Sequence, residues 1–543
     1  MYICEKKYTM VDFSFSEEQE NIFRYAQTGV NNIIVQAVAG AGKTTTLVEC
    51  VNRILQHDPN KQIMLLAHNK STKDTLLERI GKDKPNVRVY TLHGLSWRMF
   101  SEHFGFKPEI NDDKYRNYIN KNIDKIGSEL YKNLSSPKKM AYKSNLFNLV
   151  DKARHNLKQN EREIRRMAIN KYGITLIADE CHIVSNILKW GRENIKEVDF
   201  QDLLYFPHEF GYFTKRYLND IIMLDEAQDA SLAQQDVVSR CFKRNTRLLA
   251  FGDKDQTINS WCGSDTEAFE HLEDTTRFNK PSSKFPLTTN YRCGKKIIEY
   301  AKQFTDNNIR PQENAHDGVV NFNVKISEVK DGDMVLCRNT APLMDVYRKM
   351  VAEGKKVFFR GEGLGASLKE SVDCCSGESI DEMIASMKSR LIAYWEFISK
   401  EQDLTLRETS TLPYIITLFD TIKTMESLPP HIDNRDKLYQ FINEVFSNEG
   451  NEGIQLSTIH RAKGLEADNV FIICPSLIPS KLSQMDWQKE EEQHLLYVMC
   501  TRPKFSLNYV SEKDVRAHNA YSENNSFYNE LLELKKEIQI WQN

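Results

Sequence analysis

Apolar residues between positions 33 and 100 fall into short continuous runs separated by longer stretches with helical spacing. The runs at 33–35, 62–67 and 87–91 are rich in apolar residues, and the stretches at 44–56 and 71–80 repeat apolar residues as a helix does. Strands that alternate with helices in this way form parallel sheets with helices on both faces. The pattern therefore predicts an α/β domain at this end of the chain.

The pattern changes at about residue 104, where a segment rich in Lys, Asn and Glu with helical spacing continues to about 198. Strand signals return at 220–224 and 246–252, and a second α/β region begins near 284. We expect its strands at 318–323, 333–337, 356–360 and 454–458, interrupted by a helical stretch at 363–449. The predicted fold class is α/β, with two parallel-sheet domains that each carry a helical insertion. The expected domains are 1–103 with 199–283, its insertion 104–198, 284–362 with 450–543, and a reduced insertion 363–449.

Bulk composition limits the classes of function. At 543 residues the chain is too long for one core, and 40% apolar with 27% charged residues is typical of a globular protein. The net charge of −3 excludes a general polycation, so any nucleic-acid binding must come from local basic surface. The eleven cysteines show no C-x-x-C spacing, and no apolar run reaches the length of a membrane span. We expect a cytoplasmic protein with reduced thiols, or a nuclear one if the host is eukaryotic.

A small-residue turn follows the strand at 33–35 and leads into Gly42, Lys43 and Thr44 at the start of a helix. Such a turn directs several backbone N–H groups at one concavity, which suits a polyphosphate. Lys43 can reach the β- and γ-phosphates, and the Thr44 hydroxyl can bind Mg²⁺. Because Ala37 stands where the strict pattern has Gly, the motif alone also fits an ordinary βα turn.

Two further apolar runs end in polar residues. The run at 221–224 stops at Asp225 and Glu226, which could hold Mg²⁺ and polarise an attacking water. Alone, this would equally be a solvated acidic turn, but the phosphate loop makes the catalytic interpretation stronger. After the run at 249–252, Gln256 could sense a γ-phosphate, and Trp261 could be a core residue or a base-stacking platform.

Taken in order, these segments resemble the motifs of superfamily 1A DNA helicases of the UvrD/Rep/PcrA type. The segment 15–19 resembles the Q motif and 37–45 motif I; 66–70, 91–94, 225–229 and 252–263 resemble motifs Ia, Ib, II and III; 287–292, 454–466 and 492–504 resemble motifs IV, V and VI. The residues around motifs Ia and II are most similar to the branch that contains the F-box DNA helicase and its phage relatives.

The resemblance implies an ATP site between two RecA-like domains. Arg292 and Arg502 of the second domain would act as arginine fingers, Tyr291 would stack on adenine, and Glu466 would bind the ribose. The implied catalytic residues are Lys43, Asp225, Glu226, Gln256, Arg292 and Arg502, and Thr44 with Asp225 would hold Mg²⁺. The implied nucleotide-binding residues are Gln19, Ala37, Val38, Ala39, Gly40, Ala41, Gly42, Lys43, Thr44, Thr45, Tyr291, Arg292, Glu466 and Arg502.

The family pattern also implies a single-strand channel lined by His93, Trp261, Thr458 and His460, although both histidines would also fit as helix caps or core residues. We therefore expect a monomeric ATP-dependent DNA helicase or translocase that uses Mg²⁺, moves 3′→5′ and acts on single strands and single-strand/duplex junctions. One alternative is a translocase that displaces proteins without productive unwinding. Another is a non-catalytic DNA-binding scaffold, against which the intact catalytic set argues.

Motifs Ia and VI depart from the family pattern. His68 follows Ala67 where motif Ia has a base-stacking aromatic residue, and Gln493 with His494 replace a basic pair in motif VI. The predicted first insertion is rich in basic residues, which could contact DNA phosphates or could form an ordinary solvated surface. These residues are Lys121, Lys125, Lys132, Lys138, Lys139, Lys143, Lys152, Arg154, Lys158, Arg162, Arg165 and Arg166.

Overall fold

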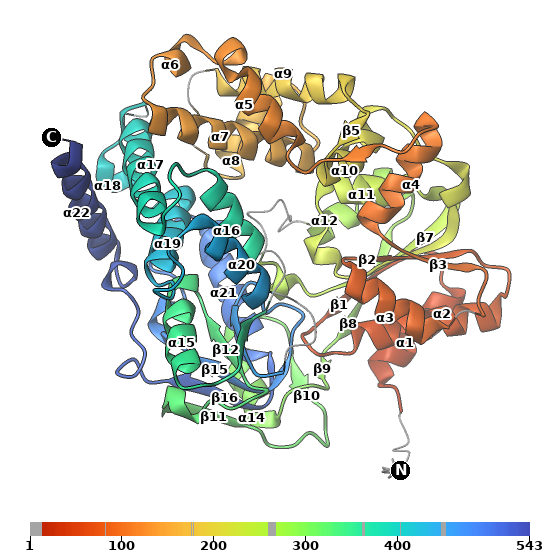
Figure 1. Cartoon of the computed structure of the whole chain (residues 1–543). Coiled ribbons are helices and arrows are strands. Elements are labelled where there is room, and N and C mark those ends of the chain that lie inside the picture. The colour runs from red at the N-terminus through yellow and green to blue at the C-terminus, as the bar shows by residue number, and fades with distance from the viewer. Residues whose placement is uncertain are drawn as a thin grey trace, which may run out of the picture.

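The computed structural model describes residues 14–81, 83–174, 176, 179–258, 268–360, 364–401, 403–446 and 452–542. Two six-stranded sheets lie in separate parts of the molecule, each with helices around it, and further helices extend above them (Figure 1). We call the parts built on these two sheets the first and the second domain. The arrangement is the α/β architecture that the sequence pattern predicts.

The sheet of the first domain is parallel throughout, with strand order β3-β2-β6-β7-β1-β8. Every residue of β2 is buried, as expected for a strand with helices on both faces. The strands are β1 (Asn32–Ala37), β2 (Ile63–Ala67), β3 (Val87–Thr91), β6 (Asn219–Leu224), β7 (Phe242–Gly252) and β8 (Ser282–Leu287). The helices are α1 (Glu17–Thr28), α2 (Lys43–His57), α3 (Lys70–Ile80), α4 (Leu92–Phe104), α10 (Phe200–Glu209), α11 (Leu232–Ser239), α12 (Ala268–Leu272) and α13 (Thr275–Phe278).

The boundary expected between residues 283 and 284 falls inside β8, so it needs correction. β8 pairs along its whole length with β1, from Asn32 opposite Ser282 to Ala37 opposite Leu287. The first domain therefore extends at least to Leu287. The short pair β9 (Thr289–Asn290) and β10 (Arg310–Pro311) follows it.

The first insertion is helical, with one short parallel pair of strands at its base. Its strands are β4 (Glu109–Ile110) and β5 (Glu197–Val198). Its helices are α5 (Lys114–Ile126), α6 (Glu129–Lys132), α7 (Ser136–His155), α8 (Glu161–Asn170) and α9 (Glu180–Glu193).

The second sheet is also parallel throughout, with strand order β11-β16-β15-β12-β14-β13. Its strands are β11 (Val319–Val324), β12 (Met334–Cys337), β13 (Val357–Phe359), β14 (Ile454–Thr458), β15 (Ala467–Ile472) and β16 (Pro503–Val510). Its helices are α14 (Lys295–Ala301), α15 (Thr340–Ala352) and α21 (Asp486–Cys500). Among the described helices, none is long and apolar enough to cross a lipid bilayer.

The second insertion packs on the first. Its helices are α16 (Leu364–Asp373), α17 (Ile380–Glu401), α18 (Leu406–Thr409), α19 (Pro413–Glu426) and α20 (Arg435–Val445). α17 packs against α7, and Tyr142 and Leu146 of α7 share one buried cluster with Tyr394 and Trp395 of α17. The upper helices in Figure 1 therefore form a bridge between the two domains.

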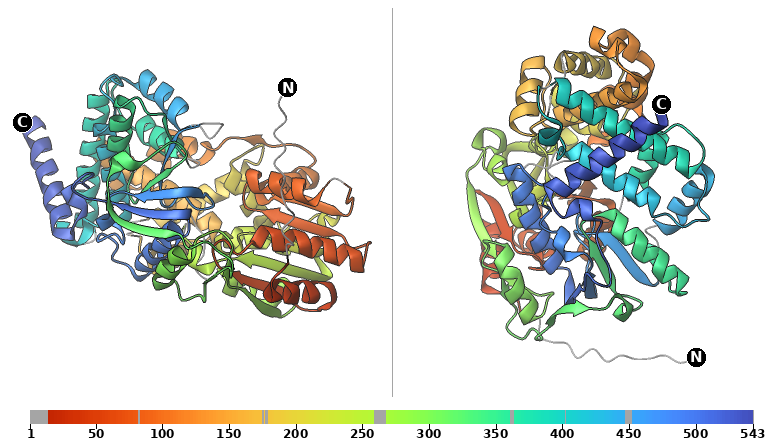
Figure 2. Two further views of the ribbon diagram at one scale, coloured as in Figure 1. Left: turned by 90° about the horizontal axis from the view of Figure 1, so that it is seen from below. Right: turned by 90° about the vertical axis from the view of Figure 1, so that its left-hand side faces the viewer.

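The last helix, α22 (Asn524–Gln542), does not pack as expected for part of the second domain. It contacts α17 of the insertion, and Figure 2 shows it running across the insertion helices. Lys423 of α19 and Glu530 of α22 form an ion pair at 3.2 Å across this contact. The expected range 450–543 for the second domain therefore includes a helix that belongs structurally to the insertion.

Candidate functional site

The loop between β1 and α2 has the backbone geometry of a phosphate cradle. Gly40 and Gly42 have φ angles of +65° and +74°, and Gly42 is the N-cap of α2 without any side-chain cap. The first N–H groups of a helix have no acceptor within the helix, so those at Lys43 and Thr44 are available to an anion. A Cβ at Gly40 would lie 2.7 Å from Asn290 Nδ2 and 3.0 Å from Arg292 Cβ, which explains the need for glycine.

Residues that follow β8 in the sequence form hydrogen bonds to this loop. Asn290 Nδ2 donates to Ala39 O at 2.7 Å, and the Ala39 N–H donates to the Tyr497 hydroxyl of α21 at 2.9 Å. Tyr291 N–H donates to Gly40 O at 2.9 Å, and its half-exposed side chain lies beside Gly42. The position of Tyr291 next to the loop fits the predicted role of a stacking residue.

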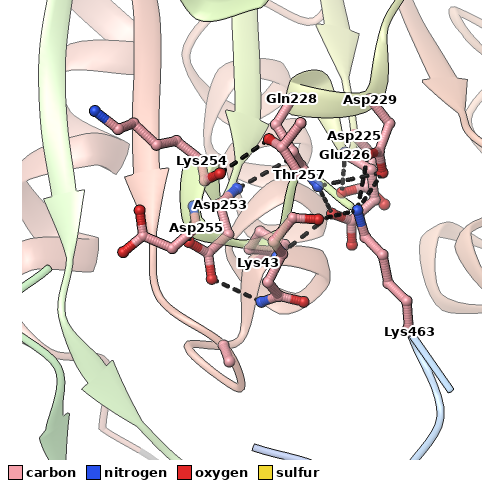
Figure 3. Close-up of polar contacts among 12 residues, drawn as sticks. Lys43, Asp225, Glu226, Gln228, Asp229, Asp253, Lys254, Asp255, Thr257 and Lys463 are labelled. Atoms are coloured by element: carbon pink, nitrogen blue, oxygen red, sulfur yellow. Dashed lines mark hydrogen bonds and ion pairs between the residues drawn. The ribbon is translucent and has the colours of Figure 1, made fainter. Parts of the chain in front are cut away.

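Three carboxyl side chains surround Lys43 (Figure 3). Lys43 Nζ lies 3.5 Å from Glu226 Oε2. Asp225 and Asp253 are also near enough to stabilise the positive charge of Lys43. Asp225 directly follows β6, while Glu226 takes a left-handed backbone conformation (φ +49°) that turns its side chain away from the strand direction. Gln228 Nε2 fixes Glu226 with a hydrogen bond of 2.8 Å.

Burial and neighbouring charges separate the pKa values of these groups. Burial opposes the charge of Lys43, but the carboxylates of Glu226, Asp253 and Asp225 raise its pKa above the usual value. Burial and the adjacent Glu226 raise the pKa of Asp225 to about 7. Burial alone would raise the pKa of Glu226, yet Lys43, Lys463 and the Gln228 hydrogen bond lower it to about 2. Glu226 is therefore the ionised carboxylate at neutral pH.

Arg292 and Arg502 of the second half lie together on the other side of the loop. Arg292 Nε donates to Glu466 Oε2 at 2.7 Å and Nη1 to Thr501 O at 3.1 Å. Arg502 is buried and donates to Val498 O, Leu465 O and Thr501 Oγ1. Burial and the charge of Arg292 lower the pKa of Arg502 to about 9, so an anion bound here would relieve the repulsion.

The remaining predicted nucleotide residues are near the loop but bind other protein groups. Gln19 Nε2 donates to Thr46 Oγ1 at 2.9 Å, and its Oε1 accepts from Ser16 N–H, which completes a capping box on α1. Gln256 Nε2 donates to Asp253 Oδ2 at 2.6 Å rather than into the loop. Arg79 Nη1 donates to Thr45 Oγ1 at 3.2 Å.

An ion pair joins the two domains directly beside this site. Lys463 of the second domain donates to both carboxylate oxygens of Asp229, at 2.8 and 2.6 Å, and to Gln256 O at 2.5 Å (Figure 3). Asp229 lies four residues after Asp225 in the turn that follows β6. The acidic turn of the first domain is therefore linked to the second domain.

The donor set suits a magnesium ion. The Asp225 carboxylate and Thr44 hydroxyl supply hard oxygen ligands, and the three carboxyl groups around Lys43 leave an excess of negative charge. No group of three or more His, Cys, Asp and Glu in the described ranges forms a metal site by itself. Mg²⁺ is usually bound by one or two carboxylates together with substrate phosphates and water.

The predicted DNA-contact residues fall into two groups. His93, on α4, is partly buried, and burial together with His155 and His68 lowers its pKa to about 4. Thr458 ends β14 and is buried, while His460 follows in the next turn, where burial, Arg338 and Arg461 lower its pKa. His93 therefore belongs to the first domain and the other two to the second. Trp261 lies outside the described residues.

Phe200 is a candidate contact residue that the sequence did not single out. It is the first residue of α10, its side chain is 49% exposed, and its ring meets the His93 ring edge-on at 5.8 Å. An exposed aromatic ring beside a candidate DNA residue is a possible stacking surface. One signal in the sequence could have indicated it, a large aromatic residue directly after the N-cap Asp199, at the first position of the helix.

The basic residues of the first insertion do not form one surface. Arg154 is 1% exposed and Lys152 is 7% exposed, so neither belongs to a solvated basic face. Arg154 instead binds both oxygens of Asp199 at 2.7 Å and Asp202 Oδ1 at 3.1 Å. Other members, such as Arg162, Arg165 and Arg166 of α8, are exposed.

Two parallel sheets with a phosphate-binding loop in one and arginines from the other beside it define a P-loop protein with two RecA-like domains. Residues 15–277 match the UvrD/REP helicase N-terminal domain, and residues 378–513 match the UvrD-like helicase C-terminal domain. The chain therefore belongs to the UvrD-like helicases of superfamily 1, the family that its motifs resemble.

Individual relatives are distant in sequence. The chain is 22% identical to F-box DNA helicase protein 1 of Schizosaccharomyces pombe, over 87% of this chain and 54% of that protein. It is 24% identical to a probable DNA helicase II homolog of Mycoplasma pneumoniae, over 54% of this chain and 42% of that protein. It is 21% identical to DNA helicase II of Salmonella typhimurium, over 93% of this chain and 86% of that protein. The match thus spans about half the length of the first two relatives.

Proposed function

We propose that the chain is an ATP-dependent DNA helicase that couples ATP hydrolysis to 3′→5′ movement along single-stranded DNA. The observation that carries the proposal is the convergence of Lys43, Arg292 and Arg502 from two domains around one loop. The direction of movement rests on the family resemblance. Named relatives in the family are DNA helicases, which supports DNA as the track.

Each charged side chain has a distinct role in this proposal. Lys43 and the N–H groups at the start of α2 neutralise the β- and γ-phosphates of ATP. Asp225 and Thr44 would hold Mg²⁺, and a bound Mg²⁺ would neutralise charge at the phosphate oxygens. Glu226 is ionised and held by Gln228, so it can accept a hydrogen bond from the attacking water and orient it.

The second domain would complete the site. Arg292 and Arg502 face an electrostatic environment that favours an anion, and their planar guanidinium groups can bridge γ-phosphate oxygens. Arginine fingers are worth roughly 10³–10⁵ in rate in related enzymes. Because these groups lie on different domains, hydrolysis and phosphate release would change how the domains fit together, and the track would be gripped alternately.

The first prediction concerns the ATPase. Lys43→Ala should lower the ATP turnover rate roughly 100-fold or more, because the transition-state phosphates lose a preorganised charge. Steady-state phosphate release with and without single-stranded DNA measures this. Lys61→Ala, on the exposed surface of the same domain, is the matched control and should retain the wild-type rate.

Strand displacement on duplexes with a 3′ or a 5′ tail separates the helicase from its alternatives. Unwinding from the 3′ tail only is the expected result. DNA-stimulated hydrolysis without unwinding would favour a protein-displacing translocase. Wild-type ATP turnover in Lys43→Ala would contradict the proposed site, and a wild-type chain without any ATP turnover would leave a DNA-binding scaffold.

The second prediction concerns the track. Phe200→Ala should raise the dissociation constant for single-stranded DNA about 5- to 150-fold, because stacking on one base is worth about 1–3 kcal/mol. The ATPase rate without DNA should stay near wild type. Fluorescence anisotropy with a labelled oligonucleotide measures the affinity. Phe322→Ala, an equally exposed phenylalanine on β11 of the second domain, should bind as the wild type does.

A further inference from the structure

Helix α21 belongs to the second domain, yet one of its faces contacts the first. His494 and Tyr497 are three residues apart and so lie on the same face. Both side chains are buried, with 8% and 0% exposure. Arg502 follows two residues after the helix ends, and the Arg502 guanidinium binds back to Val498 O at 2.8 Å. This hydrogen bond ties Arg502 to the C-terminal end of the helix.

The Tyr497 contact is made with the phosphate-binding loop. The Tyr497 hydroxyl accepts a hydrogen bond from Ala39 N–H at 2.9 Å. The Ala39 carbonyl in turn accepts from Asn290 Nδ2 at 2.7 Å. Both polar groups of Ala39 are thus paired with side chains from beyond β8. A buried N–H without its acceptor costs about 1–3 kcal/mol, so the Tyr497 hydroxyl stabilises this loop conformation.

The His494 contact is made with the loop that carries Gln256. His494 Nδ1 lies 2.8 Å from Thr257 O, and since a carbonyl can only accept, Nδ1 must carry the proton. Lys463 donates to the preceding carbonyl, Gln256 O, at 2.5 Å. Two successive carbonyls of a first-domain loop are therefore bound by two side chains of the second domain.

These contacts give a role to the departure at position 494. The family resemblance places a basic residue there, and this chain has a histidine instead. A histidine N–H makes a single short hydrogen bond to a carbonyl in a nearly closed environment, where a longer cationic side chain would have to be accommodated and paired.

We propose that His494 and Tyr497 are positioning residues that set the Gln256 loop and the phosphate-binding loop relative to Arg502. The inference rests on the proposed ATPase and adds to it the parts through which the second domain acts. Tyr497 acts through Ala39 on the loop that binds the nucleotide. His494 acts through Thr257 on the loop next to the γ-phosphate position.

The two residues should change different kinetic parameters. Tyr497→Phe removes one oxygen atom and should raise the KM for ATP about fivefold with little change in kcat, because the nucleotide-binding loop loses a hydrogen bond. His494→Phe keeps a ring but removes the donor, and it should lower kcat about tenfold with KM nearly unchanged. His494→Asn carries an amide N–H near the Nδ1 position and should recover most of kcat.

Steady-state ATP hydrolysis at saturating single-stranded DNA gives kcat and KM for each variant, and thermal melting shows that each is folded. Leu496 of α21 lines a hollow of about 590 Å³ away from the phosphate-binding loop. Leu496→Ala therefore serves as the packing control and should leave kcat and KM unchanged. Equal losses of kcat in His494→Phe and His494→Asn would overturn the role of the donor.

The outcomes separate this inference from the proposed function. A wild-type chain without ATP turnover contradicts the proposed function itself. An active wild type whose Tyr497→Phe variant has the wild-type KM overturns the inference while the ATPase stands. Because Tyr497→Phe changes so little volume, this arm remains informative even if His494→Phe does not fold.

Discussion

His93 is an example of how a side chain's surroundings decide what it can offer a ligand. Burial and the neighbouring His155 and His68 lower its pKa to about 4, so at neutral pH the ring is uncharged. An uncharged ring beside the exposed Phe200 can contact a base edge or face but adds no ionic attraction to phosphate. We therefore expect any DNA contact of His93 to be independent of salt.

The third prediction follows from the same pKa. The folded pKa of His93, about 4, lies below its unfolded value of about 6.5, so the unfolded chain takes up the proton first as pH falls. Stability present above pH 6.5 should thus be lost toward pH 4, by up to about 2 kcal/mol at pH 5. Urea unfolding at pH 7 and pH 5 should show a larger loss for wild type than for His93→Phe. Parallel pH dependences would contradict this.

The sequence predicts the functional role of a single residue when that residue belongs to a recognisable local motif. Lys43 begins the helix that follows an apolar strand, Asp225 comes directly after another apolar strand, and the structure brings the two together. Tyr497 and Asn290 could not be given their roles in the same way. Each acts on Ala39, which is more than 200 positions away, and nothing local to either residue indicates that contact.

Helix α10 shows how buried charge can fix the start of one element. Asp199 caps the helix by accepting a hydrogen bond from Asp202 N–H at 2.7 Å. Arg154 of α7 donates to both carboxylate oxygens of Asp199. Lys114 donates to Asp202 Oδ2 at 2.6 Å from the other side. Because Phe200 is the next residue after the cap, this network also sets where its exposed ring lies.

The fourth prediction tests that network. Arg154→Leu leaves buried carboxyl groups without their counter-charge and should cost about 3–5 kcal/mol of stability. Adding Asp199→Asn should recover part of the loss, since one uncompensated charge is removed. Urea unfolding followed by circular dichroism measures both. Arg162→Leu, at an exposed position of the same insertion, is the control and should change stability by less than about 0.5 kcal/mol.

At the level of elements, the apolar pattern predicted the strands β1, β2, β3, β6, β7 and β11 to β14 and the helices α2 and α3, but not β8, β15 or β16. It also could not show which charged side chains are buried against a partner. A helical stretch rich in lysine and arginine predicts a solvent-exposed basic surface, and that prediction includes Arg154. Its partner Asp199 lies 45 positions later in the chain, so only folding reveals that the arginine is internal. β8 was divided for a similar reason, because the partner that defines it, β1, is about 250 residues earlier.

For the whole molecule, the alternation of strands and helices was sufficient to predict two parallel sheets with two insertions. It could not predict that the insertions pack on each other, because the faces of α7 and α17 are each apolar whether they cover their own domain or a neighbour. The position of α22 on α17 was missed for the same reason. Contacts between distant units are set by the shape of the folded parts, which a one-dimensional pattern does not contain.

The shared core of the two insertions limits how the protein could be re-engineered. Tyr142 and Leu146 on one side and Tyr394 and Trp395 on the other bury a common apolar surface. Replacing the second insertion with that of a relative would leave the α7 side without its matching surface, and the exposed patch would promote self-association. A functional chimaera would have to exchange the two insertions together, as one unit inherited from the same parent.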